Sequence, residues 1–150
     1  MLENLKAAAE SVGITVVIAT SDKNINDQLN RITRIEKLPL ALITWDLDVT
    51  LEFDESGHLK NPTTDVTMLL VSKAETLEKI DLENMAEEMG ELFIKFLRVY
   101  KDYLAANTNV KENPITGATF TYVPSFGSAK HSGVLGKFNT QMNLEPLCQI

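Results

Sequence analysis

The feature that most constrains the fold is a long amphipathic stretch in the middle of the chain, from Leu82 to Ala106. Its apolar residues recur three and four positions apart, which is the spacing of one face of an α-helix. They are Leu82, Met85, Met89, Phe93, Phe96, Leu97, Tyr100 and Leu104. Acidic residues gather near its start, where the helix dipole favours them, and Asp81 is placed to cap the first turn. The pattern predicts one long helix that packs across a sheet and supplies the main core.

Two strands are expected before this helix. Residues 38–54 alternate polar and apolar side chains over their second half, which is typical of a strand with one buried and one solvent-exposed face. The buried set should be Leu47, Val49, Leu51 and Phe53. Residues 54–63 contain Gly57 and Pro62 and form a predicted hairpin loop, after which residues 64–72 should return as an antiparallel strand.

The start of the chain has the pattern of short elements. Residues 2–12 carry apolar side chains at helical spacing until Gly13 ends the pattern, and the β-branched segment 14–19 is expected to be a strand. A second short helix is expected over residues 28–35. Together with the other segments, these elements predict an α+β fold: a mainly antiparallel sheet of four or five strands, with the long helix on one face and a short N-terminal helix.

The last part of the chain is depleted in charge. Residues 113–150 contain three charged side chains, Lys130, Lys137 and Glu145, although the segment alternates like two strands joined by a loop. Depletion of charge is typical of the core of a protein interface, so the segment favours self-assembly. The alternative is that these strands are buried inside the monomer.

Size and charge narrow the classes of function. A chain of 150 residues and 16.7 kDa fits one domain, residues 1–150. The formal net charge is −7, which argues against sequence-independent binding of nucleic acid. The lone Cys148 allows no intrachain disulfide, and the apolar stretch 11–21 is about half the roughly 20 residues that a membrane helix needs. We therefore expect a cytoplasmic protein with no membrane partner.

Motifs for catalysis or cofactor binding are not found. There are two isolated histidines, His58 and His131, and no GxSxG, HExxH, P-loop or Rossmann glycine pattern. The acidic residues that start at Asp46 alternate along a strand, so their side chains would lie about 7 Å apart, which is too wide for one cation. We expect no catalytic residue, no metal and no cofactor.

The expected order of elements resembles small bacteriophage neck and tail-completion proteins of the tail terminator type. The resemblance covers nearly the whole chain, and three segments carry it. They are the hairpin LPLALITWDLDVTLEF…TTDVTMLLVS, the amphipathic helix after it and the final strand GVLGKFNTQMNLEPL. The family implies a homo-oligomeric ring, commonly a hexamer, that caps the tail tube and docks to the head connector. DNA then passes through the lumen as cargo, and the protein becomes a virion component after assembly in the cytoplasm.

Under this resemblance, two sets of residues are candidates for function. An acidic strand face would line the lumen: Asp46, Asp48 and Glu52. Contacts with other subunits or partners are expected at His58, Leu59, Phe126, His131, Phe138 and Met142.

Two other classes stay open. Acidic dimeric chaperones of bacterial secretion systems have a similar size and charge, but they usually end in a helix, whereas this chain ends in the strand-like segment EPLCQI. A small-molecule enzyme with a curved sheet would need a pocket with a tuned acid or base. In this chain, that requires His58, Asp65 and His131 to converge in space.

Overall fold

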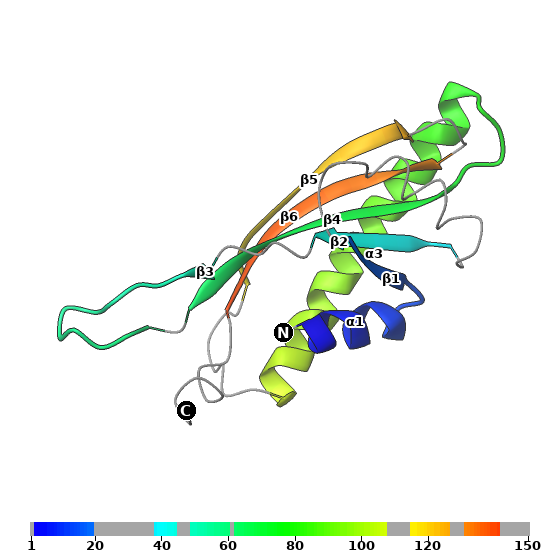
Figure 1. Cartoon of the computed structure of the whole chain (residues 1–150). Helices are drawn as coiled ribbons and strands as arrows, with labels where there is room; N and C mark the ends of the chain where they lie inside the picture. The colour runs from blue at the N-terminus through cyan, green and yellow to red at the C-terminus, as the bar shows by residue number, and fades with distance from the viewer. Residues whose placement is uncertain are drawn as a thin grey trace.

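The computed structural model describes residues 2–19, 38–44, 49–60, 62–107, 115–126 and 131–141. The predicted α+β class, with a long helix and a short N-terminal helix, is confirmed (Figure 1). The elements in chain order are α1 (Leu2–Ser11), β1 (Thr15–Ala19), β2 (Leu40–Thr44), β3 (Val49–Thr50), β4 (Thr63–Lys73), α3 (Lys79–Asn107), β5 (Ile115–Phe126) and β6 (His131–Gln141). The helix expected at 28–35 and Cys148 lie outside the described residues.

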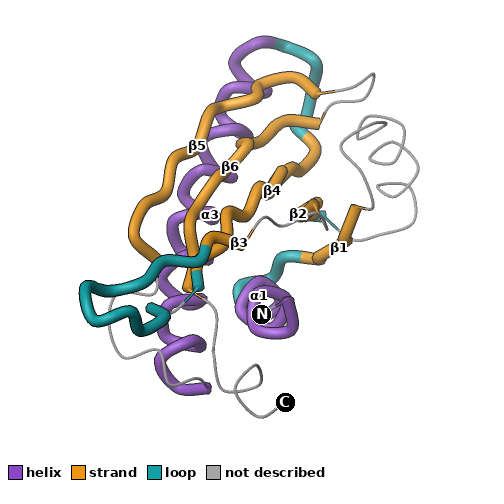
Figure 2. Tube along the Cα trace, turned by 60° about the vertical axis from the view of Figure 1, so that its left-hand side comes forward, coloured by secondary structure: helices purple, strands orange, loops and turns teal. Residues whose placement is uncertain are grey.

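All the described strands belong to one sheet, in the order β1-β2-β4-β6-β5, with the two-residue β3 also paired to β4. The pairs are antiparallel apart from β1 and β2, which are parallel. The sheet is therefore mainly antiparallel, as expected, and has one strand more than predicted. The helix α3 runs across one face of the sheet, and α1 packs beside it (Figure 2). Neither α1 nor α3 combines the length and the apolar character that a membrane crossing requires.

The main core lies between α3 and the sheet, and it is aromatic. Phe138 from β6 contacts the rings of Phe96 and Tyr100, with ring centroids 6.0 Å apart in both pairs. Phe93 lies over β6 at Gly136, where an added Cβ would come within 2.4 Å of the ring. A buried hydrogen bond of 3.1 Å joins the Tyr100 hydroxyl to Thr140 of β6. Because β6 lies between β4 and β5 under the helix, the second strand of the charge-poor C-terminal hairpin is part of the monomer core.

The sheet also has an apolar region on the face away from α3, where β2 and β4 lie side by side. Alternate residues of β2 and β4 form a second buried cluster there: Leu40, Leu42, Leu69 and Val71. These strands are buried on both faces, which explains why their sequences, LALIT and MLLV, are continuous apolar runs instead of alternating ones.

The start of α3 differs from the prediction. The helix begins at Lys79, so Asp81 lies inside the first turn and is not the capping residue. Its carboxylate accepts a hydrogen bond of 2.5 Å from the Thr76 hydroxyl, and Thr76 in turn accepts one of 3.0 Å from the amide of Glu78. These two hydrogen bonds hold the loop before the helix against its first turn.

The burial predicted for the first hairpin is wrong in β3 and beyond it. Val49, Leu51 and Phe53 were expected to be buried, but they are 48%, 57% and 63% exposed. The reason is that only Val49–Thr50 pairs with β4. Beyond that pair, the chain leaves the sheet as a two-limbed projection, and no described helix or strand lies above or below it (Figure 1). We call residues 49–60 the arm.

Candidate protein-interaction surface

The arm is an ordered hairpin. At its tip, Asp54 and His58 close the turn: the amide of Asp54 donates to the carbonyl of His58, and the amide of His58 donates to Asp54 Oδ1, both at 2.8 Å. Gly57 has a φ of 81°, a conformation that a glycine adopts without strain. A further backbone bond from Lys60 to Glu52 and a bridge between Phe53 and Leu59 join the two limbs.

One face of this arm is apolar. Successive strand residues point to opposite faces, and bridged partners point to the same face. The apolar side chains of the arm therefore share one face: Val49, Leu51, Phe53 and Leu59. They are 39% to 63% exposed, and they make up half of the large apolar side chains that are exposed in the described part of the chain. The alternation read from the sequence was correct, but its apolar face has no cover from the described residues of this chain.

The other face of the arm is polar and acidic. Glu52 and Asp54 alternate with the apolar residues, and Glu55 lies at the tip, all on exposed positions. With Lys60 as the single lysine, the arm carries a net charge of −2. His58 is also exposed, with its Nδ1 3.8 Å from Asp54 Oδ1. Of the candidate lumen residues, Glu52 is therefore exposed on the arm, while Asp46 and Asp48 lie outside the described residues.

The candidate interface residues separate into three groups. His58 and Leu59 are exposed on the arm, as an interface requires. Phe138 is 3% exposed and His131 1% exposed, so both are core residues of the monomer and their assignment to an interface is wrong. The charge depletion that motivated that assignment reflects burial of β6 between β4, β5 and α3. Phe126 ends β5 opposite His131, and Met142 lies outside the described residues.

His131 is buried in an unusual way. Neither of its ring nitrogens has a hydrogen-bond partner among the residues that the structure describes. Burial lowers the pKa of His131 below its usual value of 6.5, and the adjacent Lys73, its register partner on β4, lowers it further. The ring is therefore neutral at pH 7, and it fills space at the end of the sheet.

The three residues that an enzyme site would need do not converge. Asp65 pairs in register with Asn139 and accepts a hydrogen bond of 3.0 Å from its amide. His131 lies eight residues from Asn139 along β6, which corresponds to roughly 26 Å of strand. His58 is in the arm beyond the sheet (Figure 1). In addition, no cluster of metal-ligating side chains occurs within the described ranges.

A shallow depression lies on the sheet near Asp65, with a volume of about 510 Å³. Polar side chains from three adjacent strands line it, among them Thr67, Thr119, Lys137 and Asn139. The Asp65 carboxylate is engaged by Asn139, and no other ionisable carboxyl, histidine or cysteine is among its described lining residues. Its described lining therefore holds one carboxyl group, of Asp65, and one amine, of Lys137.

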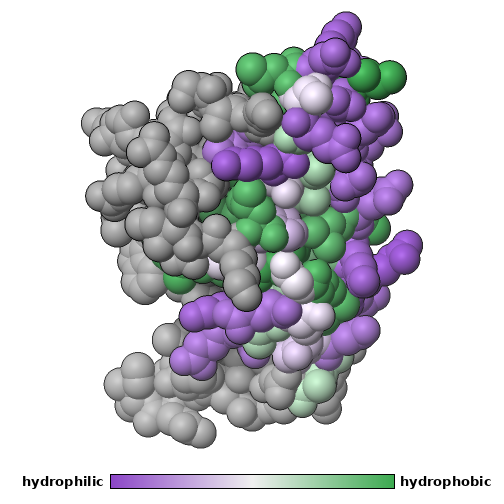
Figure 3. Space-filling model, turned by 90° about the vertical axis from the view of Figure 1, so that its right-hand side faces the viewer, coloured by the Kyte–Doolittle hydropathy of each residue, from purple (hydrophilic) through white to green (hydrophobic). Residues whose placement is uncertain are grey.

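The exposed side of α3 has a marked division of charge. Residues 79–91 carry five carboxylates and one lysine, a net charge of −4. Residues 92–104 carry Lys95, Arg98 and Lys101 with one carboxylate, a net charge of +2. This arrangement agrees with the helix dipole. Hydrophilic residues cover this side of the molecule and apolar residues form a band next to them (Figure 3).

Comparison with known proteins adds no relative. No protein-family model matches the chain, and a search of curated proteins finds no similar sequence. The interpretation of function therefore depends on the geometry of the arm and the sheet.

Proposed function

We propose that this protein is a structural subunit of a phage or prophage tail or neck, which forms a homo-oligomeric ring and has no catalytic turnover. The observation that carries the proposal is the arm, an ordered hairpin with an apolar face that its own chain leaves exposed. Contiguous exposed apolar surface on a rigid element is characteristic of sites for protein contact.

The arm also favours head-to-tail association. It projects from one end of the sheet, which gives it the reach to contact the body of a neighbouring molecule. Contacts between two different surfaces form closed rings when the rotation between copies closes. The resemblance to tail terminators supplies the biological setting: a ring, commonly a hexamer, between tail tube and head connector, assembled in the cytoplasm and retained in the virion.

In such a ring, the acidic character of the chain suits the passage of DNA. A net charge of −7 repels the phosphate backbone, so DNA moves through as cargo without specific binding. Within this proposal, Asp46 and Asp48 line the lumen, whereas Glu52 lies on the arm and belongs to the contact between copies.

The test removes the apolar face of the arm without changing its charge. The variant Leu51→Ser with Phe53→Ser is compared with wild type by light scattering after size exclusion, over a wide range of concentration. A matched control, Thr50→Ser with Ser56→Ala, changes two exposed and uncharged polar side chains of the same arm. We expect rings for wild type and control, and folded monomers for the apolar-face variant.

Three results would contradict the proposal. A variant that assembles like wild type would show that the apolar face makes no contact. A wild-type monomer at every concentration would show that the chain does not self-associate, and a tight dimer at every concentration would favour the chaperone class. Circular dichroism confirms that the variants are folded.

A further inference from the structure

Resting on the proposed function, we infer that the arm of one copy docks on the β5–α3 margin of the next copy. We define this margin as the free edge of β5 together with four exposed side chains beside it, Ile94, Arg98, Lys101 and Tyr122. The inference identifies the second half of a head-to-tail interface, and three features of the margin support it.

The first feature is an unprotected strand edge. β5 is the last strand of the sheet and pairs with β6 on one side, while no described strand pairs with its outer side. Exposed edges are usually protected from association by charged side chains, by proline or by bulges. β5 has no charged residue over its whole length, and its register irregularities and Pro124 lie close to its two ends. The central residues 117–123 therefore present an open edge that is suited to contact with another chain.

The second feature is apolar surface next to that edge. Tyr122 is 50% exposed and Ile94 is 41% exposed. The position of Tyr122 depends on Gly90 of α3, because a Cβ at Gly90 would lie 3.2 Å from the tyrosine ring. The ring packs edge-on against Phe120, with centroids 5.3 Å apart, and half of its surface stays open. Aromatic side chains of this kind are typical anchors in protein interfaces.

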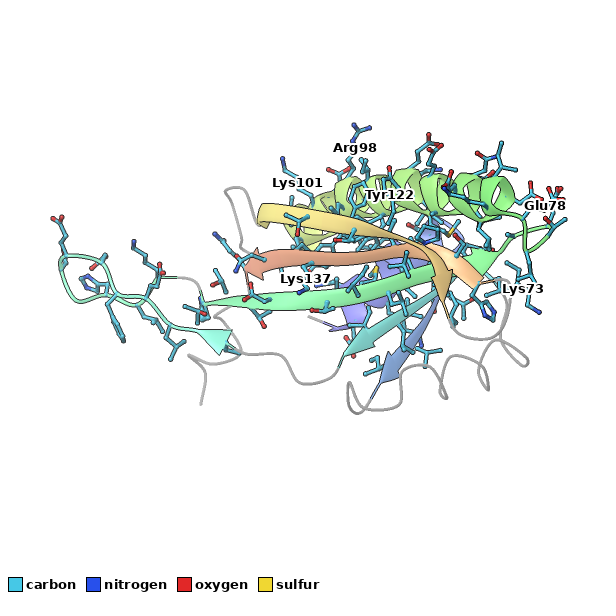
Figure 4. The ribbon with its side chains drawn as sticks, turned by 90° about the horizontal axis from the view of Figure 1, so that it is seen from above. Lys73, Glu78, Arg98, Lys101, Tyr122 and Lys137 are labelled. Atoms are coloured by element: carbon cyan, nitrogen blue, oxygen red, sulfur yellow. The ribbon has the colours of Figure 1, made fainter. Side chains whose placement is uncertain are left out.

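The third feature is complementary charge. The arm carries a net charge of −2, and the half of α3 that contains Arg98 and Lys101 carries +2. Arg98 and Lys101 are exposed and form no ion pair with any described residue (Figure 4). The first half of α3, with a net charge of −4, would repel the arm. Charge therefore selects the end of the helix that the arm approaches.

The arm and the margin of one molecule do not meet each other. The arm extends past the end of the sheet, away from β5 and α3 (Figure 4). The contact is therefore between copies, with the apolar face of the arm against Ile94 and Tyr122, and its acidic residues near Arg98 and Lys101. An open chain of subunits then has an unused arm at one end and an unused margin at the other end, until the ring closes.

A charge-reversal experiment tests this contact. The margin variant is Arg98→Glu with Lys101→Glu, and the arm variant is Glu52→Lys with Glu55→Lys. Each should weaken ring assembly by about tenfold or more in concentration at low salt, and the four changes combined in one chain should restore it. The matched control is Lys6→Glu with Lys73→Glu, which makes the same change in charge at exposed positions of α1 and β4 and should assemble like wild type.

The results separate this inference from the proposed function. If the margin variant assembles like wild type, the docking site is wrong, whereas loss of assembly on Leu51→Ser with Phe53→Ser would still support the ring. If both charge variants lose assembly and the folded combination does not recover it, the pairing of these two surfaces is overturned. If assembly depends on neither the arm nor the margin, the inference and the proposed function fail together.

Cross-linking distinguishes docking of the arm on the margin from direct pairing of the β5 edges of two copies. In a chain with Cys148→Ser, a mixture of the single variants Glu55→Cys and Arg98→Cys should form a disulfide between copies under oxidising conditions. If the variant Thr121→Cys cross-links to itself instead, two β5 edges pair about a two-fold axis, and the inference is overturned.

Discussion

At the scale of single residues, the core depends on a close approach between β6 and α3. Gly136 lies under Phe93, and a Cβ at this position would come within 2.4 Å of the ring. The rings of Phe96, Phe120 and Phe138 leave Phe93 little room to move, because their centroids lie 6.5, 5.9 and 6.2 Å from its own. The glycine is therefore required for packing.

We predict that Gly136→Ala lowers the free energy of unfolding by about 1–3 kcal/mol, the usual cost of overpacking a core. The matched control is Gly117→Ala on β5, where an added Cβ meets nothing within 4 Å, and it should leave stability within about 0.5 kcal/mol. Urea denaturation followed by circular dichroism measures both. Equal stability of the two variants would show that Phe93 and β6 are not packed as described.

His131 gives the fold a predictable dependence on pH. Its pKa in the folded protein is lowered, first by burial and then by Lys73, while the unfolded chain takes up a proton near the ordinary value of 6.5. As the pH falls through about 6.5, the unfolded state binds more protons than the folded state, so this residue's contribution to stability is lost. The contribution is fully present above that pH.

The variant His131→Met fills this position with an apolar side chain that takes up no proton. We expect wild type to lose more stability than the variant when the pH is lowered from 7.5 to 5, as measured by urea denaturation at each pH. The carboxylates are common to both proteins, so the difference between the two profiles isolates the histidine. Parallel profiles would contradict a buried neutral imidazole.

At the scale of elements, the period of the apolar residues predicted most of the secondary structure. The helix expected at 82–106 is α3, and the strands expected at 14–19, 64–72 and in the C-terminal segment are β1, β4, β5 and β6. The period of a pattern does not identify what covers the apolar face. For this reason, Phe53 was expected to be buried within the chain and is exposed, while Phe138 was expected at an interface and is buried.

The two proposed contact surfaces, the arm and the β5–α3 margin, could be predicted from the sequence only in part. The exposed side chains of the arm, His58 and Leu59, were among the predicted contact residues, because a loop between two strands is a usual place for contacts. The margin was not predicted, since it depends on β5 being the last strand of the sheet. That order follows from β6 pairing with β4, a contact between segments far apart in the sequence. The lack of charge over residues 115–126 was the available signal, but it indicated burial as readily as an exposed edge.

The rest of the protein should fold without the arm. Replacing residues 51–60 by an Asn-Gly turn removes no residue of the buried core clusters, so the thermal midpoint should change by no more than a few degrees. The same protein should no longer assemble, as judged by light scattering. If removal of the arm unfolds the protein, the arm belongs to the core and its apolar face is not free for a partner.

At the scale of the whole molecule, the features combine into a subunit with two unlike surfaces. The layer of α1, α3 and the sheet is internally packed, the acidic amphipathic arm leaves one end of the sheet, and an uncharged edge with basic flanking residues lies along β5. Under the proposed function, copies joined through these two unlike surfaces form a ring with two different faces, one for the tail tube and one for the head connector.

The most direct measurement is the mass of the wild-type particle by light scattering after size exclusion, from low to high protein concentration, with negative-stain images of the largest species. Closed rings are predicted, and a hexamer of 16.7 kDa subunits would have a mass of about 100 kDa. A particle that stays monomeric at the highest concentration, or one that stops at a dimer, would contradict the account.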